Sequence, residues 1–372
     1  MRPSFVLMLL LAAGLAAAEE PIYDFKGHAK FRLIGFSIPQ DSILFATSGS
    51  ESLNIESDLR LNFSASNGGW TFDSAYQLFA LNGDNVEWAN DDLRLFNFSD
   101  TIHEKSKTIV AHRLDRLWVG YSNEKTVLRF GRQALTWGNG LFFTPMDLVN
   151  PFDPAAIDTE FKSGDDMLYL QYLRDNGDDI QGAVVFRRDP VSMDVRSDQA
   201  TTTLKYHGFV GENEYDVLLA ENYDATVLGV GGVRSIGGAV LRGDLVVTDS
   251  LDGSVVQLVA NLSHSWLWNE KNVSGAVEYF YDDGVDYVAG SLTIELSPLW
   301  TTTPTLLINA SDRSALLQLT TGYSVSDNMA FLGSLNLPIG ANGTEYGGSE
   351  TGVPGQYLSI DWGVFAQLAW YF

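Results

Sequence analysis

Residues 358–372 read LSIDWGVFAQLAWYF, and an apolar residue stands at every second position. The apolar series is Leu358, Ile360, Trp362, Val364, Ala366, Leu368 and Trp370, followed by Phe372. The alternate positions include Ser359, Asp361, Gly363 and Gln367. A period of two predicts a β-strand with one apolar face, because successive side chains of a strand point to opposite faces.

The same pattern is clearest in residues 53–65. Leucine, isoleucine and phenylalanine alternate there with Asn54, Glu56, Asp58, Arg60 and Asn62. One face suits lipid and the other suits water. A Ser-Asn-Gly-Gly turn at residues 66–69 leads into a second alternating stretch, so the two segments predict a β-hairpin.

The ending resembles the C-terminal signature of bacterial outer-membrane β-barrel proteins, which is a terminal Phe with hydrophobic residues two and four positions earlier. Phe372, Trp370 and Leu368 carry this resemblance. It implies that the barrel-insertion machinery recognises these three residues as an assembly signal.

Residues 1–18 combine Arg2, an apolar run and small residues up to Ala18, which predicts a secretory signal peptide cleaved after Ala18. No later apolar run reaches the roughly 20 residues of a membrane-spanning helix. The chain contains no cysteine, which suits passage through an oxidising periplasm and excludes thiolate chemistry. We therefore expect export to the bacterial outer membrane of a Gram-negative cell.

Charged residues make up only 19% of the chain, below the roughly 25% typical of soluble domains, whereas glycine and aromatic residues are abundant. Such a composition is typical of a membrane β-barrel, in which lipid-facing and lumen-facing residues alternate. After removal of Arg2, 47 acidic residues face 22 basic ones, a net charge of −25. This acidity excludes nucleic acid as a partner.

Eighteen alternating segments can be counted between residues 24 and 372, although 16 remains an alternative. Short turns containing Asn, Asp or Gly alternate with longer connections at residues 38–50, 82–112, 135–164 and 338–356. We predict an all-β, antiparallel up-and-down transmembrane barrel over residues 19–372, with short periplasmic turns and long extracellular loops. A barrel of this size is wide enough for an aqueous lumen.

Residues 129–165 depart from strand alternation. The order GRQ, then WG, then DLVNPFDP, then a charged stretch resembles a pattern in porin-like outer-membrane proteins, including alginate-export-type barrels and uncharacterised relatives. The match covers about forty residues and implies a porin-like barrel without naming the solute. Three prolines within this segment exclude a central strand, so it predicts a structured loop.

We expect residues 138–164 to fold into the lumen and to narrow the pore. In this hypothesis the loop acids meet arginines of the wall, and opposed charges select solutes. The candidate constriction residues are Arg129, Arg132, Asp147, Asp153, Asp158 and Glu160. The alternative is that the loop caps the outer rim through Asp-to-backbone hydrogen bonds.

Little other chemistry is indicated. The five histidines have no metal-ligand spacing, and His264 and Ser265 cannot form a catalytic pair because adjacent strand residues point to opposite faces. Gly229-Val230-Gly231-Gly232 is followed by no helix, so it predicts a bend or a close approach rather than a nucleotide loop. We expect no enzyme activity, no cofactor and no metal.

The leading function is an outer-membrane channel for small hydrophilic solutes or ions. The alternative is a non-channel barrel with a structural, adhesive or assembly role. Expected partners are outer-membrane lipid, the insertion machinery and small solutes, while the sequence leaves monomer and homo-oligomer open. Overall acidity favours cations, but arginines gather along neighbouring strands at positions 113, 116, 129, 132, 187 and 188. Local charge at the narrowest point would outweigh the total, because distant exposed charges are screened.

Overall fold

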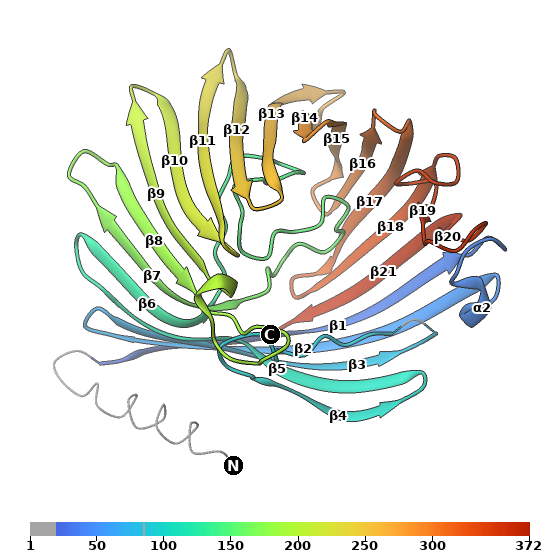
Figure 1. Cartoon of the computed structure of the whole chain (residues 1–372), viewed down its shortest axis with the longest axis horizontal. Helices are drawn as coiled ribbons and strands as arrows, with labels where there is room; N and C mark the ends of the chain where they lie inside the picture. The colour runs from blue at the N-terminus through green and yellow to red at the C-terminus, as the bar shows by residue number, and fades with distance from the viewer. Residues whose placement is uncertain (1–19, 85) are drawn as a thin grey trace.

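A computed structural model describes residues 20–84 and 86–372, so the predicted signal peptide at residues 1–18 lies outside the described residues. Eighteen antiparallel strands form a closed barrel (Figure 1). These strands are β1 (Ile22–Ser37), β2 (Glu51–Asn67), β3 (Trp70–Asn82), β5 (Thr108–Ser122), β6 (Thr126–Gln133), β7 (Asp165–Leu173), β8 (Asp179–Val185), β9 (Thr201–Val210), β10 (Asn213–Asn222), β11 (Ala225–Ile236), β12 (Ala239–Ser250), β13 (Gly253–Trp268), β14 (Lys271–Asp282), β15 (Val285–Ser297), β16 (Trp300–Asn309), β17 (Ser314–Ser326), β18 (Met329–Ile339) and β21 (Trp362–Tyr371).

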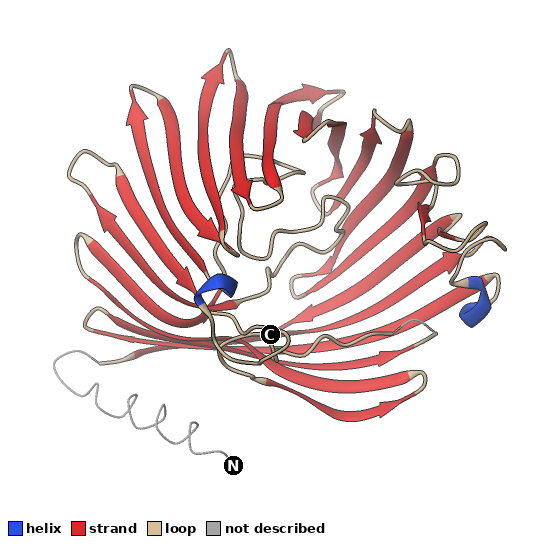
Figure 2. Cartoon of the chain, in the orientation of Figure 1, coloured by secondary structure: helices blue, strands red, loops and turns tan. Residues whose placement is uncertain are grey.

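Figure 2 shows how little else the described chain contains. The remaining elements are the strands β4 (Ser99–Lys105), β19 (Ser349–Glu350) and β20 (Tyr357–Leu358), the single helical turn α2 (Phe45–Ser48) and the 3-10 turn η1 (Ser197–Gln199). No helix in the described part is both long and apolar enough to cross a membrane.

Alternation along the strands makes the barrel apolar outside and places most of the polar side chains inside. On β2, Leu53 is 57% exposed whereas its neighbour Asn54 is 6% exposed, and Arg60 is buried between the half-buried Leu59 and Leu61. On β21, Trp370 and Leu368 are exposed while Gln367 is buried. A soluble domain usually buries apolar side chains and exposes polar ones, and these strands do the opposite, as the sequence predicts for a barrel wall.

The first and last strands close the cylinder. β1 pairs with β21 over a ladder that runs from His28 opposite Tyr371 to Ser37 opposite Trp362. Because β1 also pairs with β2, and β21 also pairs with β18, both strands have two neighbours and no free edge. The count of eighteen is confirmed and the alternative of 16 is wrong. The connections at 38–50, 83–107, 134–164, 186–200 and 340–361 all lie on one rim.

The wall between β5 and β8 is completed by a segment outside the regular meander, residues 91–105, which we call the wall patch. β6 ends at Gln133, so the long-loop half of β5 has no β6 neighbour, and β4 pairs there instead. At the other end of the patch, Arg94 forms a β-bridge with Arg187, which lies two residues after the end of β8. The long connection predicted at residues 82–112 thus contains a strand of its own.

Candidate functional site

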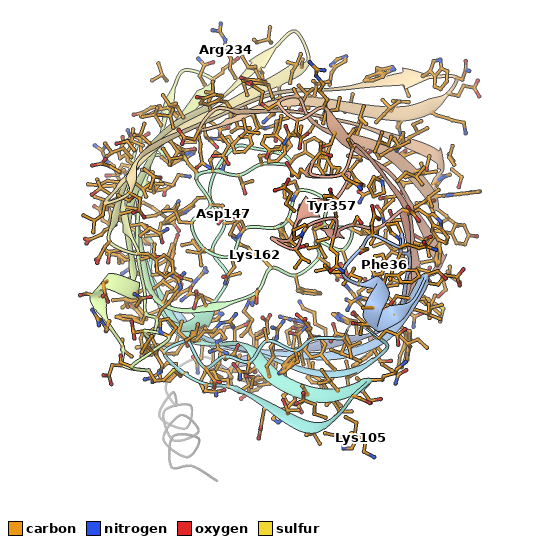
Figure 3. The ribbon with its side chains drawn as sticks, turned by 45° about the vertical axis from the view of Figure 1, so that its right-hand side comes forward. Phe36, Lys105, Asp147, Lys162, Arg234 and Tyr357 are labelled. Atoms are coloured by element: carbon orange, nitrogen blue, oxygen red, sulfur yellow. The ribbon has the colours of Figure 1, made fainter. Side chains whose placement is uncertain are left out.

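The chain leaves the wall at Gln133 and returns at Asp165, and these two residues are direct partners in the β6–β7 ladder. The 31 residues between them, 134–164, contact inward-facing side chains around the barrel and are called the inner loop. Figure 1 shows the inner loop as green coil inside the ring of strands. In Figure 3, which looks through the barrel, Asp147 and Lys162 both lie within the ring.

One carboxylate of the wall holds the first turn of the inner loop. Glu278 on β14 is fully buried, and its two oxygens accept hydrogen bonds from the backbone N–H groups of Leu141, Phe142 and Phe143 at 2.6, 3.0 and 2.8 Å. The side chain of Asn261 on β13 donates a further bond at 3.2 Å. A charged acceptor with several donors makes a strong and directional anchor.

A second anchor lies two residues earlier, at Asn139. Asn139 donates from its backbone to Asp244 on β12 at 2.7 Å and from its side-chain amide to Asp244 and to Asp216 on β10. A Cβ atom at Gly231 would lie 2.1 Å from Asp244 Oδ1, and one at Gly229 would lie 3.1 Å from Met146 Cε. The glycine run on β11 therefore marks a close approach, as the sequence predicts.

The inner loop also has an apolar face that packs on the wall. Its members are almost completely buried together with inward-facing residues of β7 to β12. The cluster consists of Trp137, Met146 and Val149 from the loop, and of Met167, Tyr169, Ala183, Val185, Leu218, Ala220, Val227 and Val246 from the wall. Burial of such side chains stabilises a contact by about 1.5–3 kcal/mol each, before entropy is counted. The loop is thus held by a core inside the barrel.

A buried lysine near the end of the inner loop ties that end to the start and to the middle of the loop. Lys162 Nζ donates to both carboxylate oxygens of Asp147, at 2.6 and 2.5 Å, and to the carbonyl of Leu135 at 2.6 Å. Burial raises the pKa of Asp147 and lowers the pKa of Lys162, while the attraction between the two charges opposes both shifts. The pair fixes the loop as a closed unit across the lumen.

The end of the inner loop is held by cations of β1. Lys30 contacts Asp158 at 2.6 Å and Glu160 at 2.7 Å, and Arg32 donates to Asp158 at 3.1 Å. The hydroxyl of Tyr371 on β21 donates to Glu160 at 2.9 Å. Burial acts to raise the pKa of Asp158, but Lys30 and Arg32 outweigh it and hold this pKa below its usual value of 3.8.

Acid should therefore loosen this end of the loop. Because the folded pKa of Asp158 is lowered, its contact contributes fully above about pH 4 and is lost as the pH falls below that value. We expect the accessibility of the inner loop to increase below pH 4, and an Asp158→Asn variant to show this behaviour already at pH 7. An unchanged pH profile in the variant would contradict the assignment.

The predicted wall arginines are not the partners of the loop acids. Arg132 is fully buried and pairs with Asp91 and Asp166, so it fastens the wall patch. Arg129 lies between two rings, with its Cζ 5.0 Å from the centre of Trp118 and 5.7 Å from that of Tyr169. The prediction of Arg129 and Arg132 opposite the loop acids was wrong, because other cations occupy those places.

The four predicted acids have different surroundings. Asp158 and Glu160 meet Lys30, and Asp147 meets a lysine of the loop itself. Asp153 is exposed and accepts a bond from the backbone of Ala155, which is the Asp-to-backbone contact of the rim-cap alternative. The predicted recognition of Leu368, Trp370 and Phe372 by insertion machinery stays a prediction.

Sequence reasoning missed Glu278, Asp244, Lys30 and Arg32 as partners of the loop. The only available signal was a charge on the inward face of a strand, as at Glu278 between Val277 and Tyr279. Many inward positions of a barrel are charged, so this signal does not single out an anchor. In residues 20–84 and 86–372 no cluster of three or more metal-binding side chains occurs.

Solved structures with a similar fold are known. The OccAB1 structure of Acinetobacter baumannii matches with a TM-score of 0.58 and 9% identity, over 94% of this chain and 96% of that one. The BenF-like porin of Pseudomonas fluorescens Pf-5 matches with a TM-score of 0.56 and 8% identity, over 96% and 100%. The chain has the fold of an outer-membrane porin.

A barrel with a different description also has a similar fold. Wzi of Escherichia coli, an outer-membrane carbohydrate-binding barrel involved in capsule assembly, matches with a TM-score of 0.55 and 12% identity, over 98% of this chain and 86% of that one. No family model and no curated sequence matches the chain. Identities this low relate the barrels by fold alone.

Proposed function

We propose that the chain is a channel of the bacterial outer membrane that passes small hydrophilic solutes or ions through a lumen narrowed by the inner loop. The observation that carries this proposal is the combination of an apolar outer face with a polar inner face that is crossed by an anchored segment. Exposed aliphatic and aromatic side chains suit acyl chains, while buried charges and hydroxyls suit water. The inner loop then sets the size and charge of the passage.

The inner wall is chemically divided, which supports a selective passage. Lysine and arginine side chains line β1, β2, β5 and β6, whereas β15 to β18 present hydroxyls and amides such as Thr293, Thr303 and Gln318. A solute in the lumen would meet charges on one side and neutral hydrogen-bonding groups on the other. Neutral groups exchange readily with hydrated solutes, so they favour passage over retention.

A second candidate is a barrel that does not conduct. The apolar cluster that contains Met146 and the buried pair of Lys162 and Asp147 hold the inner loop in place, as expected of a plug. Wzi, a carbohydrate-binding barrel, has a similar fold. Such a barrel would serve a structural, adhesive or assembly role.

Cysteine modification distinguishes the two candidates, since the chain has no cysteine of its own. Gln318 is buried and Leu319 is exposed, so Thr320 on β17 faces inward. After reconstitution into planar bilayers, a charged methanethiosulfonate reagent should lower the conductance of Thr320→Cys and leave that of Leu319→Cys unchanged. Equal responses of the two variants, or no current from the unmodified protein, would favour the non-conducting barrel.

A further inference from the structure

Part of the barrel wall is not built from paired strands. β6 and β7 both stop at the partners Gln133 and Asp165, whereas β5 continues past them. Because β6 and β7 lie between β5 and β8, the gap above them is three strand spacings, or about 14 Å, wide. Residues 91–98 of the wall patch, which we call the panel, fill this gap. The panel reaches Leu114 of β5 at one end and Arg187 at the other.

Side chains hold much of the panel in place. Arg188 donates to the carbonyl groups of Arg94 and Leu95 at 3.1 and 2.9 Å. The N–H group of Phe96 donates to the carboxylate of Asp166 at 2.8 Å. In a strand ladder the neighbouring backbone supplies such partners, whereas here the loss of one side chain takes the donors away from two carbonyl groups.

The panel borders the lipid-facing surface. β6 is eight residues long, so at about 3.3 Å per residue and a tilt of about 40° it covers roughly 20 Å of an apolar band that is about 25 Å tall. The panel therefore closes the barrel at the height of the outer leaflet. Its Leu93 is exposed, and the ring of Phe96 lies 6.4 Å from that of Phe130, which is exposed on the outer face of β6.

An apolar strip on the lumenal face borders the same gap. It combines inward-facing residues of β3 and β5 with two residues of the chain that leads into the panel, namely Phe79, Leu81, Val86, Trp88, Ile109 and Ala111. Ile109 and Ala111 lie on the part of β5 that pairs with β4, next to the panel. The indole N–H group of Trp88 is buried without a hydrogen-bond partner in the part of the chain that the structure describes. Apolar surface beside an aqueous lumen favours contact with hydrocarbon.

We propose that the panel is a lateral gate, through which the hydrocarbon tail of an amphiphile passes between the lumen and the outer leaflet. The gap is about three times as wide as an extended chain, so a tail fits once the panel moves. The strip receives the tail on the lumenal side. Because β4 ties one end of the panel to β5 by a strand ladder, the panel opens at its other end, along Arg188. This route goes beyond the proposed channel and does not depend on ion conduction.

Photolabelling of the wild-type protein tests whether lipid tails reach the strip. The probe is a phosphatidylcholine that carries a diazirine at the end of one acyl chain and is mixed into proteoliposomes. Peptide mapping should find label on Trp88, because an open panel admits a tail to the strip. Trp137 is the internal control, since it is buried in the apolar cluster of the inner loop and stays out of reach of the tail.

Two arginines of the same connection provide matched variants. Arg188→Gln removes the donors to two carbonyl groups of the panel, while Arg196→Gln removes a side chain that pairs with Asp198. Arg188→Gln should raise the label on Trp88 roughly five-fold, as expected when a hydrogen-bonded contact is lost. Arg196→Gln should leave the label unchanged. The heat-sensitive gel shift checks that each variant is folded before labelling.

The gate is overturned by an unlabelled Trp88 in the wild type, by equal label on Trp88 in Arg188→Gln and Arg196→Gln, or by equal labelling of Trp88 and Trp137. Conductance separates this proposal from the channel. A conducting barrel with an unlabelled Trp88 would remove the gate and leave the channel. A silent barrel with label on Trp88 alone would remove the channel and leave the gate.

Discussion

Replacing residues 134–164 by a two-residue Asn-Gly turn should raise the single-channel conductance several-fold. The design is compatible with the barrel, because Gln133 and Asp165 are direct partners and a tight turn can join them. The inner loop spans from Glu278 on β14 to Lys30 on β1, so its removal clears the region it crosses. Conductance in planar bilayers and the folded fraction on unheated gels provide the measurement.

Glu278→Ala provides a milder version of the same test. It leaves three backbone donors of the inner loop unsatisfied, at a cost of about 1–3 kcal/mol each if they remain buried. The first turn of the loop should therefore detach while the apolar cluster remains, and the current should become noisier with a modest rise in mean. If both the excision and Glu278→Ala left the conductance unchanged, the inner loop would not limit the passage.

Arg132→Ala should produce the largest loss of stability of any single substitution considered. Arg132 is fully buried, and its removal leaves Asp166 without a cation and Asp91 with Arg94 alone. Breaking a buried pair in this way costs about 3–5 kcal/mol, because a carboxylate remains desolvated and uncompensated. The backbone carbonyl of Phe96 also loses a donor. The midpoint of urea unfolding, followed by the heat-sensitive gel shift, should fall accordingly.

The matched comparisons are Arg234→Ala and the double variant Arg132→Met with Asp166→Leu. The first removes an arginine that has no ion-pair partner among the described residues, so the midpoint should stay within error. The second removes opposite charges together and should recover part of the loss. A midpoint for Arg132→Ala equal to that of Arg234→Ala would show that the ion network does not hold the wall patch.

The sequence alone predicts the barrel because the alternation within each strand indicates which side chains face lipid and which face the lumen. The alternation at residues 53–65 and 358–372 sets which face is apolar, and the tight turns set the hairpins. The count of eighteen follows from local pattern without any knowledge of partners. Strand ends are predicted less accurately. The wall patch is not predicted by local alternation, because β4 pairs with the part of β5 that the short strand β6 does not reach.

The partners of the inner loop could not be read in the same way. Proline and aspartate at residues 145–154 indicate an irregular loop, but contact with Glu278, Lys30 or Arg32 depends on which inward side chains lie at the same height. The position of a side chain along the barrel axis is set by the pairing of all strands in the closed cylinder, and it cannot be derived from one segment. Arg132 illustrates the same point, since its neighbours in space come from residues 91 and 166.

The wall patch has a consequence for how the molecule is made. Residues 91–105 are synthesised before β6 to β8, yet their two ends must join β5 and residue Arg187, which lie far apart in the sequence. Contacts between such distant stretches form slowly, since a long intervening chain must first be ordered. The wall is therefore expected to stay open at this place until β6 to β8 have formed, and proteases and chaperones would have access to it until then.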